Sequence, residues 1–319
     1  MKLSFLIPTY NRAENVKNQI SFIDSLPSIP ETEIEIIIGD NSDNLDTCNY
    51  VQSSNLKNVI YFKNDVNIGY GRNVIKCFEY SSGDFIWLLG DKNFFSSESY
   101  LNIANLLKRN YDAILIAKGI GNNNDVVYEN IDELVAEFGF RFSNLNCAIL
   151  NKKCLSTIAK CYKYSELNFT HVAVILEFLS SLEKINVLWY KNNIFKLRNL
   201  HMSYWNNNVF QVFAHDWFYT IMGLPNKISV TSKIECLKGL NTKDHIFSPY
   251  SIIRTRLFTS RQFSLKDLKE NREYLELTSF SSYWKIFWAV VLPLPSGLLK
   301  PIIKYKWNHN KKITNNNML

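Results

Sequence analysis

The first 117 residues alternate between short apolar runs and segments of helical periodicity, and this alternation restricts the fold more than any other feature. The apolar runs span residues 3–7, 34–40, 59–62, 85–89 and 113–117. Runs of this length without polar breaks are typical of strands covered on both faces. Helices between such strands make them parallel through right-handed crossovers. We therefore expect an α/β fold, with a mostly parallel sheet flanked by helices.

Polar residues directly follow three of the expected strands. They are Thr9, Tyr10, Asn11 and Arg12 after the first, Asp40, Asn41, Ser42 and Asp43 after the second, and Asp91, Lys92 and Asn93 after the fourth. In open parallel sheets, ligands bind beyond the carboxyl ends of the strands. We expect the three loops to meet in one crevice.

Two helices carry recognisable cap candidates. Asn11 precedes a pattern that places Val16 and Ile20 on one helix face, and Thr170 lies near the start of the apolar helix expected over residues 168–182. Asparagine and threonine are favoured N-caps because their side-chain oxygens accept hydrogen bonds from the first free backbone N–H groups. We expect both residues to cap their helices.

The formal net charge of +7 is concentrated in the C-terminal part of the chain. From residue 246 onward there are 12 Lys and Arg against 4 Asp and Glu. A nucleic-acid-binding protein is expected to carry basic residues across its folded body, so we expect no nucleic acid partner. The uneven distribution favours a local partner such as an anionic membrane surface.

The six cysteines form no C-x-x-C pair, and we expect most to be reduced core thiols.

An uncharged apolar segment of 14 residues, 286–299, lies within this basic region. It is shorter than the ~20 residues needed to span a bilayer. We expect it to lie at a membrane surface, with Trp284 and Trp288 at headgroup depth. The lysines expected to contact anionic lipid are Lys300, Lys304, Lys306, Lys311 and Lys312. The alternative is a pair of C-terminal core helices.

The expected location is cytoplasmic, and peripheral on the inner face of the cell membrane. The apolar run near the N-terminus is too short for a signal peptide, which favours a cytosolic protein. Attachment through the basic apolar region would then hold the folded body at the inner membrane surface.

Four segments together resemble a known enzyme family. Residues 4–16, 35–43, 67–91 and 168–179 are similar to inverting glycosyltransferases of family 2 with the GT-A fold. The resemblance is to the branch that builds bacterial surface polysaccharides, which includes abequosyltransferase-like proteins. It is good to about residue 95, thinner to about residue 222, and absent beyond.

The resemblance implies a domain organisation. A GT-A domain would occupy residues 1–222, with a nucleotide-sugar-binding half at 1–100 and an acceptor-binding half at 101–222. Residues 223–319 would form a helical, basic and apolar region that associates with a membrane. The acceptor would be a lipid-linked glycan, or one of lipopolysaccharide or capsule type.

The resemblance also implies which residues bind the nucleoside diphosphate sugar. They are Pro8, Thr9, Tyr10, Arg12, Asp40, Gly69, Arg72, Asp91 and Lys92. Asp40 would accept a hydrogen bond from a pyrimidine N–H group, and Arg72 would reach the diphosphate or donor sugar. Taken alone, Asp40 is more typical of an Asx-turn after a strand.

In this family, acidic residues after the fourth strand bind Mg²⁺ or Mn²⁺. Here Asp91 is followed by Lys92 and Asn93, where a second acid is expected. Because Mg²⁺ needs only one or two carboxylates when phosphates supply other ligands, we expect weakened metal binding by Asp91 and Asn93. In an alternative arrangement, Lys92 supplies part of the positive charge beside the diphosphate.

The catalytic base is expected at the start of the helix over 168–179, where family members usually carry an acidic pair. This chain has Thr170 and His171 there. A neutral imidazole with a pKa near 6.5 accepts a proton at cytosolic pH, so His171 is the first candidate. The other candidates are Glu166, Glu177, His201 and Asp216.

The altered metal and base motifs leave a second function open. A catalytically degenerate subunit would bind the sugar nucleotide within a polysaccharide assembly complex without transferring the sugar. Aromatic residues between 201 and 221 are candidates for sugar stacking, although the spacing of Phe210, Phe213, Trp217 and Ile221 favours a core helix.

Overall fold

The computed structural model describes most of residues 1–278 and three positions beyond them. The residues left out before 279 are Asn55, Asp91, Lys92, 117–123, Asn193, 198–207, Pro249, Ile252, 254–256 and 258–264, and the described residues after 278 are Leu294, Leu298 and Pro301. The predicted sites at Asp91, Lys92 and His201, and most of the predicted membrane-surface segment, therefore lie outside the described residues.

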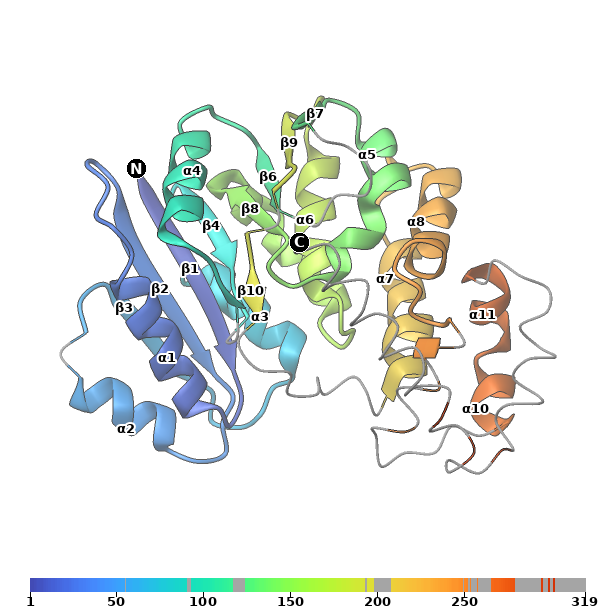
Figure 1. Ribbon diagram of the computed structural model, residues 1–319, viewed down its shortest axis with the longest axis horizontal. Helices are drawn as coiled ribbons and strands as arrows, with labels where there is room; N and C mark the ends of the chain where they lie inside the picture. The colour runs from blue at the N-terminus through green and yellow to red at the C-terminus, as the bar shows by residue number, and fades with distance from the viewer. Residues whose placement is uncertain are drawn as a thin grey trace.

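A mixed sheet forms the centre of the molecule (Figure 1). In the described part of the chain it has eight strands, in the order β3-β2-β1-β4-β8-β6-β9-β7. Their bounds are β1 Lys2–Thr9, β2 Glu33–Asp40, β3 Val59–Lys63, β4 Phe85–Leu88, β6 Ala113–Ile116, β7 Val126–Tyr128, β8 Ala148–Asn151 and β9 Val187–Tyr190. Strands β1 to β4 are parallel, whereas β8 is antiparallel to both of its neighbours. The predicted α/β fold with a mostly parallel sheet is confirmed.

The two faces of the sheet are covered by different helices, because successive strand residues point to opposite faces. Leu3, Phe5 and Ile7 of β1 pack in one apolar cluster with α1 (Ala13–Asp24) and α4 (Ser97–Leu107). Leu6 joins the opposite cluster, with α3 (Tyr70–Glu79), α5 (Ile131–Phe138) and α6 (Thr170–Ser181). The apolar runs of β1, β2, β4 and β6 correspond to strands enclosed in this way, whereas β3 is an edge strand with one buried residue of five.

The remaining helical segments lie mainly in the second half of the chain. They are α2 Asp46–Ser53, the 3₁₀ segments Gly139–Ser143 and Lys152–Tyr164, a π-helical turn Gln211–Asp216, α7 Trp217–Met222, α8 Val230–Thr242, α10 Leu265–Glu270 and α11 Arg272–Thr278. Cys236, Leu237 and Leu240 of α8 belong to the same apolar cluster as α5 and α6. Apolar packing thus continues across residue 222, and the domain division there stays a prediction.

Both helix-cap predictions are wrong. Asn11 has a left-handed backbone (φ 52°), and its side-chain oxygen accepts from the Asp43 backbone N–H, 3.1 Å away, so it pairs with the next loop instead of α1. Thr170 is the first residue of α6, and its hydroxyl donates backward to the carbonyls of Tyr164 and Leu167. For Asn11 a hydrogen bond with another loop replaces the expected local one, and for Thr170 the hydroxyl bonds backbone carbonyls three and six residues earlier instead of capping the helix.

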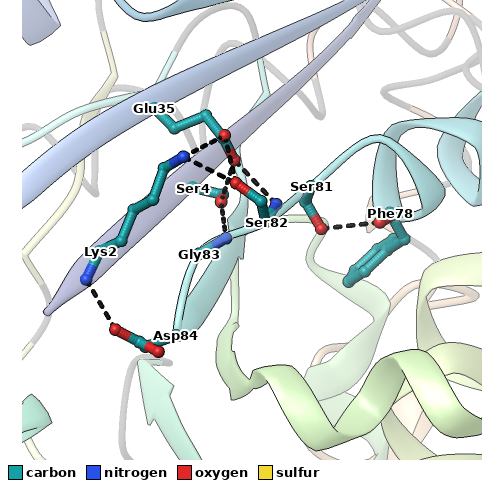
Figure 2. Close-up of polar contacts among 8 residues, drawn as sticks. All are labelled: Lys2, Ser4, Glu35, Phe78, Ser81, Ser82, Gly83 and Asp84. Carbon is teal, nitrogen blue, oxygen red and sulfur yellow. Dashed lines mark hydrogen bonds and ion pairs between the residues drawn. The ribbon is translucent and has the colours of Figure 1, made fainter.

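A buried polar cluster ties the strands together at the amino edge of the sheet (Figure 2). Glu35 is 3% exposed, and its carboxylate accepts hydrogen bonds from the Ser4 hydroxyl at 2.6 Å and the Ser82 hydroxyl at 2.6 Å. The Lys2 ammonium lies 2.6 Å from the same carboxylate. Burial by itself raises the pKa of Glu35, but these donors outweigh it and lower the pKa to about 2.

Candidate functional site

The carboxyl ends of β1, β2 and β4 lie side by side at one edge of the sheet. Thr9 pairs in register with Asp40, and Leu6 pairs with Leu88, so the three following loops start at neighbouring positions. The loop after β4 is described at Gly90 and again from Asn93, which begins β5 (Asn93–Phe94). Strand β5 pairs with β10 (Lys196–Leu197) and so joins this loop to the second half of the chain.

The loops after β1 and β2 are joined by hydrogen bonds. The Tyr10 hydroxyl donates to the Asp43 carboxylate at 2.7 Å, and the Asn11 backbone N–H donates to the Ser42 hydroxyl at 2.8 Å. The bond with Asp43 raises the pKa of Tyr10, and the same bond lowers the pKa of Asp43. Tyr10 remains 46% exposed, so its ring faces solvent at the edge of the site.

Asp40 is fully buried in the wall of this site. One of its carboxylate oxygens accepts from the Ser42 backbone N–H at 2.8 Å, and the other accepts from the Tyr61 hydroxyl at 2.9 Å. Burial raises the pKa of Tyr61, and the neighbouring Asp40 carboxylate raises it further. The hydroxyl of the adjacent Thr9 is buried without a hydrogen-bond partner among the described residues.

The first turn of α3 approaches the segment before α6 closely. A Cβ atom on Gly71 would lie 2.2 Å from the Ser165 carbonyl oxygen and 2.3 Å from the Thr170 hydroxyl, so only glycine fits. The next residue, Arg72, pairs with Glu166 through Nε and Nη2, both 2.9 Å from Oε1. Both side chains are more than half exposed, so the pair lies on the surface of the site.

His171 lies in the first turn of α6, where it contacts α3. Its Nδ1 is 3.0 Å from the Tyr70 hydroxyl and its Nε2 is 3.0 Å from the Phe142 carbonyl oxygen. A carbonyl only accepts, so Nε2 carries the proton and Nδ1 accepts from Tyr70. His171 is 5% exposed, and burial lowers its pKa to about 4, which replaces the value near 6.5 expected from the sequence.

The other base candidates differ in accessibility. The Glu166 side chain is 76% exposed, whereas Glu177 is buried and bonded to the Tyr164 hydroxyl at 2.9 Å. Asp216 is 3% exposed and accepts from Asn168, and from Gln211 Nε2 at 2.8 Å. Glu166 is therefore the one acidic candidate of these three that faces solvent beside Arg72.

The sequence profile of the family described as "Glycosyl transferase family 2" matches residues 4–165. The chain belongs to glycosyl transferase family 2. The matched region contains β1 to β4, α3 and the three polar loops, whereas Glu166 and His171 lie just beyond it.

Known proteins of this kind resemble the chain in sequence or in fold. The abequosyltransferase RfbV of Salmonella typhimurium (strain LT2) is 30% identical over 118 residues, which is 36% of this chain and 35% of RfbV. The chain thus aligns with about a third of that relative's length. Residues 1–349 of TarS from S. aureus, also solved with UDP-GlcNAc, superimpose with a TM-score of 0.52 at 14% identity, covering 97% of this chain and 92% of TarS 1–349.

A second solved structure has the same fold. The mannosyltransferase PcManGT from Pyrobaculum calidifontis, in complex with GDP-Man and Mn²⁺, gives a TM-score of 0.54 at 8% identity, covering 89% of this chain and 82% of PcManGT. At these identities the likeness concerns the fold alone. With the family match, it confirms the GT-A fold implied by the sequence resemblance.

The metal site predicted at Asp91 and Asn93 is described only at Asn93. The Asn93 backbone carbonyl oxygen accepts a hydrogen bond from Gln19 Nε2 at 3.1 Å. A Cβ atom on Gly90 would lie 3.2 Å from the Asn93 side-chain oxygen, so that oxygen lies over the exit of β4. Among the residues that the structure describes, no three His, Cys, Asp or Glu side chains cluster as metal ligands.

No helix within the described residues is long and apolar enough to cross a bilayer. Leu294, from the predicted surface segment, packs with Tyr250 and Leu257 around the buried Ile253. Leu298 is 63% exposed. Trp284, Trp288 and the lysines from Lys300 onward lie outside the described residues.

The four residues whose spacing predicted a core helix are buried. Phe210, Phe213, Trp217 and Ile221 are each 7% exposed or less. The cysteine prediction is also confirmed, since all six are free and only Cys48 is not fully buried.

Three polar residues that contact the candidate site were not expected from the sequence. Tyr61 binds Asp40, Tyr70 binds His171, and Asn64 contacts the loop after β2. Asn64 directly follows the parallel strand β3, so the rule that selected the other strand ends would also have selected it. Tyr70 carries no such signal, because its partner is 101 residues away.

Proposed function

We propose that the chain transfers a sugar from a nucleoside diphosphate donor to a hydroxyl group of a glycan, with inversion at the anomeric carbon. The observation that supports this most directly is the meeting of the three polar loops at one sheet edge, set by the pairing of Thr9 with Asp40 and of Leu6 with Leu88. The bound donors named for TarS and PcManGT support a nucleoside diphosphate sugar. The similarity to abequosyltransferase RfbV supports sugar transfer, and the lipid-linked or lipopolysaccharide-type acceptor is carried over from the sequence resemblance.

The proposed donor contacts come from the loops that follow β1 and β2. Tyr10, with Pro8 and Arg12, borders the base and ribose, and the unpaired Thr9 hydroxyl supplies one hydrogen bond. Asp40 would accept an N–H group of the base through its remaining lone pairs, because each carboxylate oxygen accepts more than one hydrogen bond. Since Asp40 is fully buried, this contact requires the surrounding loops to expose it. Gly69 immediately precedes α3, the helix that carries Arg72, which is the proposed diphosphate-binding residue.

Arg72 binds the diphosphate after it separates from Glu166. This exchange costs little, because exposed ion pairs contribute about 0–1 kcal/mol. A guanidinium that gives up one carboxylate gains two phosphate groups, which it binds through parallel N–H donors.

The residues present fit a divalent cation of modest affinity. Asp91 would supply a carboxylate and Asn93 the amide oxygen that lies over Gly90, while diphosphate oxygens complete the set. Bound there, Mg²⁺ or Mn²⁺ would neutralise charge that develops on the leaving diphosphate. Lys92 adds a fixed positive charge at the same loop.

His171 is the proposed proton acceptor, and it acts through Tyr70. Since both ring nitrogens are already hydrogen-bonded, the acceptor hydroxyl gives its proton to the Tyr70 oxygen as Tyr70 gives its own proton to Nδ1. The new imidazolium keeps its Nε2–H bond to the Phe142 carbonyl. The acceptor oxygen, relieved of its proton, attacks the anomeric carbon as the diphosphate leaves.

Sugar transfer and donor hydrolysis by an Asp91→Ala variant test the proposal. We expect the wild-type chain to release nucleoside diphosphate from a sugar nucleotide, and the variant to lose this activity while remaining folded. Asp24→Ala, which removes an exposed carboxylate of α1, is the matched control and should keep full activity. Full activity in Asp91→Ala would contradict the assigned site. Donor binding by the wild-type chain with neither transfer nor hydrolysis would indicate a sugar-nucleotide-binding subunit without catalysis.

A further inference from the structure

Three asparagine side chains form a buried network beneath the candidate donor site. Asn41 follows β2, Asn64 follows β3, and Asn73 lies in α3; they are 3%, 4% and 2% exposed. Buried amide groups are costly unless they are hydrogen-bonded, so the partners of these three residues determine what the network does.

Asn64 is the centre of this asparagine network. Its Nδ2 donates to the side-chain oxygens of Asn41 at 2.8 Å and Asn73 at 3.1 Å, and its own Oδ1 accepts from Lys76 Nζ at 2.5 Å. Its backbone N–H donates to the Asp40 carbonyl oxygen at 2.8 Å. The side-chain amide group of Asn64 therefore bonds both the residue after β2 and a residue of α3.

The outer ends of the asparagine network bind the backbone on both sides of the site. Asn41 Nδ2 donates to the Gly69 carbonyl at 3.0 Å, and Asn73 Nδ2 donates to the Gly39 carbonyl at 2.8 Å. Gly69 has a φ of 84° and begins α3, so the first bond fixes a backbone turn that other residues rarely adopt. At Gly39, a Cβ atom would lie 2.7 Å from the Asn73 oxygen, so glycine makes room for the network.

The network thus connects the end of β2, which carries Asp40, to the first turn of α3, which carries Arg72. One nucleoside diphosphate must contact both residues at once if Asp40 binds the base and Arg72 the diphosphate. A hydrogen-bonded group buried between them sets their separation before the donor arrives, which lowers the ordering cost of binding.

We propose that Asn64 is a positioning residue for donor binding, and that it acts by fixing the first turn of α3 against the end of β2. The inference rests on the proposed donor site. Asn64 touches neither sugar nor phosphate in this account. Its removal leaves the side-chain oxygens of Asn41 and Asn73 without their donor, so the two walls of the site lose their common partner.

Calorimetry on the full chain tests this proposal. It measures the dissociation constants of UDP, CDP, dTDP and GDP, each in the presence of MnCl₂. For the nucleotide that the wild-type chain binds most tightly, Asn64→Ala should raise the dissociation constant about tenfold or more. Ser4→Ala is the matched control. Ser4 is fully buried at the opposite edge of the same sheet, where it donates to Glu35 at 2.6 Å and accepts from the Gly83 N–H at 2.9 Å.

Both variants should lose stability, but only the Asn64 variant should lose affinity. If Asn64→Ala does not fold, Asn41→Ala, which removes the bond to Gly69, should show the same loss of affinity. The positioning role is overturned if the folded asparagine variant binds within twofold of the wild type, or if Ser4→Ala weakens binding equally. A wild-type chain that binds none of the four nucleotides overturns the proposed donor site together with this inference.

Discussion

His171 illustrates, at the scale of one residue, how neighbouring groups decide the chemistry of a side chain. An isolated histidine titrates near pH 6.5, but the buried His171 ring, held between Tyr70 and Phe142, has its pKa lowered to about 4. The sequence identified the position and residue type. It did not predict the proton arrangement, because that arrangement depends on a tyrosine in α3 and a carbonyl 29 residues away.

Replacing Tyr70 tests the proton route at this residue. Tyr70→Phe removes the hydroxyl that donates to His171 Nδ1 and leaves the ring in place, so we expect kcat to fall by about 10²-fold while donor affinity is unchanged. His171→Gln should give a similar loss. Steady-state kinetics and donor titration measure the two effects.

The matched control for this prediction is Tyr128→Phe. The Tyr128 hydroxyl bonds Glu137 at 2.8 Å, in the β7–α5 region away from the site, so its removal should leave kcat near the wild-type value. If Tyr70→Phe keeps full turnover and Glu166→Gln loses it, the base is Glu166.

Two buried titratable groups predict how stability depends on pH. The folded pKa of His171 lies below its ordinary value, so the unfolded chain binds more protons and the free energy of unfolding falls as pH drops from about 6.5 to about 4. The folded pKa of Glu35 is also lowered, to about 2, so its stabilising contribution is present above about pH 4.5 and is lost below it.

Urea unfolding at several pH values separates the two contributions. His171→Gln should flatten the decrease between pH 6.5 and 4, which amounts to at most about 3 kcal/mol. Glu35→Gln should leave that window unchanged and flatten the decrease below pH 4.5. Equal slopes in the wild type and His171→Gln would show that the imidazole is not held neutral in the folded chain.

At the scale of elements, the strands were predictable and the helix starts were not. The apolar runs between residues 3 and 116 all became strands. Four of them are largely buried, whereas the run at 59–62 became the edge strand β3, with one of its five residues buried. The cap at Asn11 failed because its side chain bonds the loop after β2, and the cap at Thr170 failed because its hydroxyl bonds the carbonyls of the preceding residues Tyr164 and Leu167. The convergence of three strand ends was likewise predictable from the topology of parallel sheets, whereas the Arg72–Glu166 contact was not.

The two glycines that begin α3 should differ in their response to alanine. Gly71→Ala places Cβ against the Ser165 backbone and should cost about 3 kcal/mol of stability, since backbone cannot move aside as a flexible side chain does. Gly69→Ala meets open space and should cost only about 1 kcal/mol, from its left-handed backbone. Chemical denaturation of both variants measures this, and equal losses would contradict the close contact of α3 with the segment before α6.

At the scale of the whole molecule, charge and apolar surface are distributed unequally along the chain. The body before residue 246 is nearly neutral, and the positive charge follows it. A family 2 enzyme acting on a lipid-linked acceptor benefits from attachment to an anionic membrane, where each nearby Lys or Arg contributes about 1 kcal/mol. The membrane association stays a prediction, because Trp284, Trp288 and the lysines from Lys300 onward lie outside the described residues.

Vesicle co-sedimentation tests the membrane proposal. Changing Lys300, Lys304 and Lys306 to Glu should reduce binding of the full chain to phosphatidylserine-rich vesicles by more than tenfold, with little effect on phosphatidylcholine vesicles. The control changes three exposed lysines of the body, Lys57, Lys108 and Lys160, to Glu and alters net charge equally. Equal loss in both variants would indicate that overall charge, not the C-terminal region, attracts the vesicle.

The central claim is that a nucleoside diphosphate sugar binds where β1, β2 and β4 end. The most direct test is to measure the melting temperature of the full chain with UDP-, CDP-, dTDP- and GDP-sugars and MnCl₂. A ligand that binds only the folded chain stabilises it by about 2.7 kcal/mol at 100 times its dissociation constant. We predict that at least one of these donors raises the melting temperature of the wild-type chain and that Arg72→Ala loses most of the increase. An unchanged melting temperature with every donor at millimolar concentration would contradict the claim.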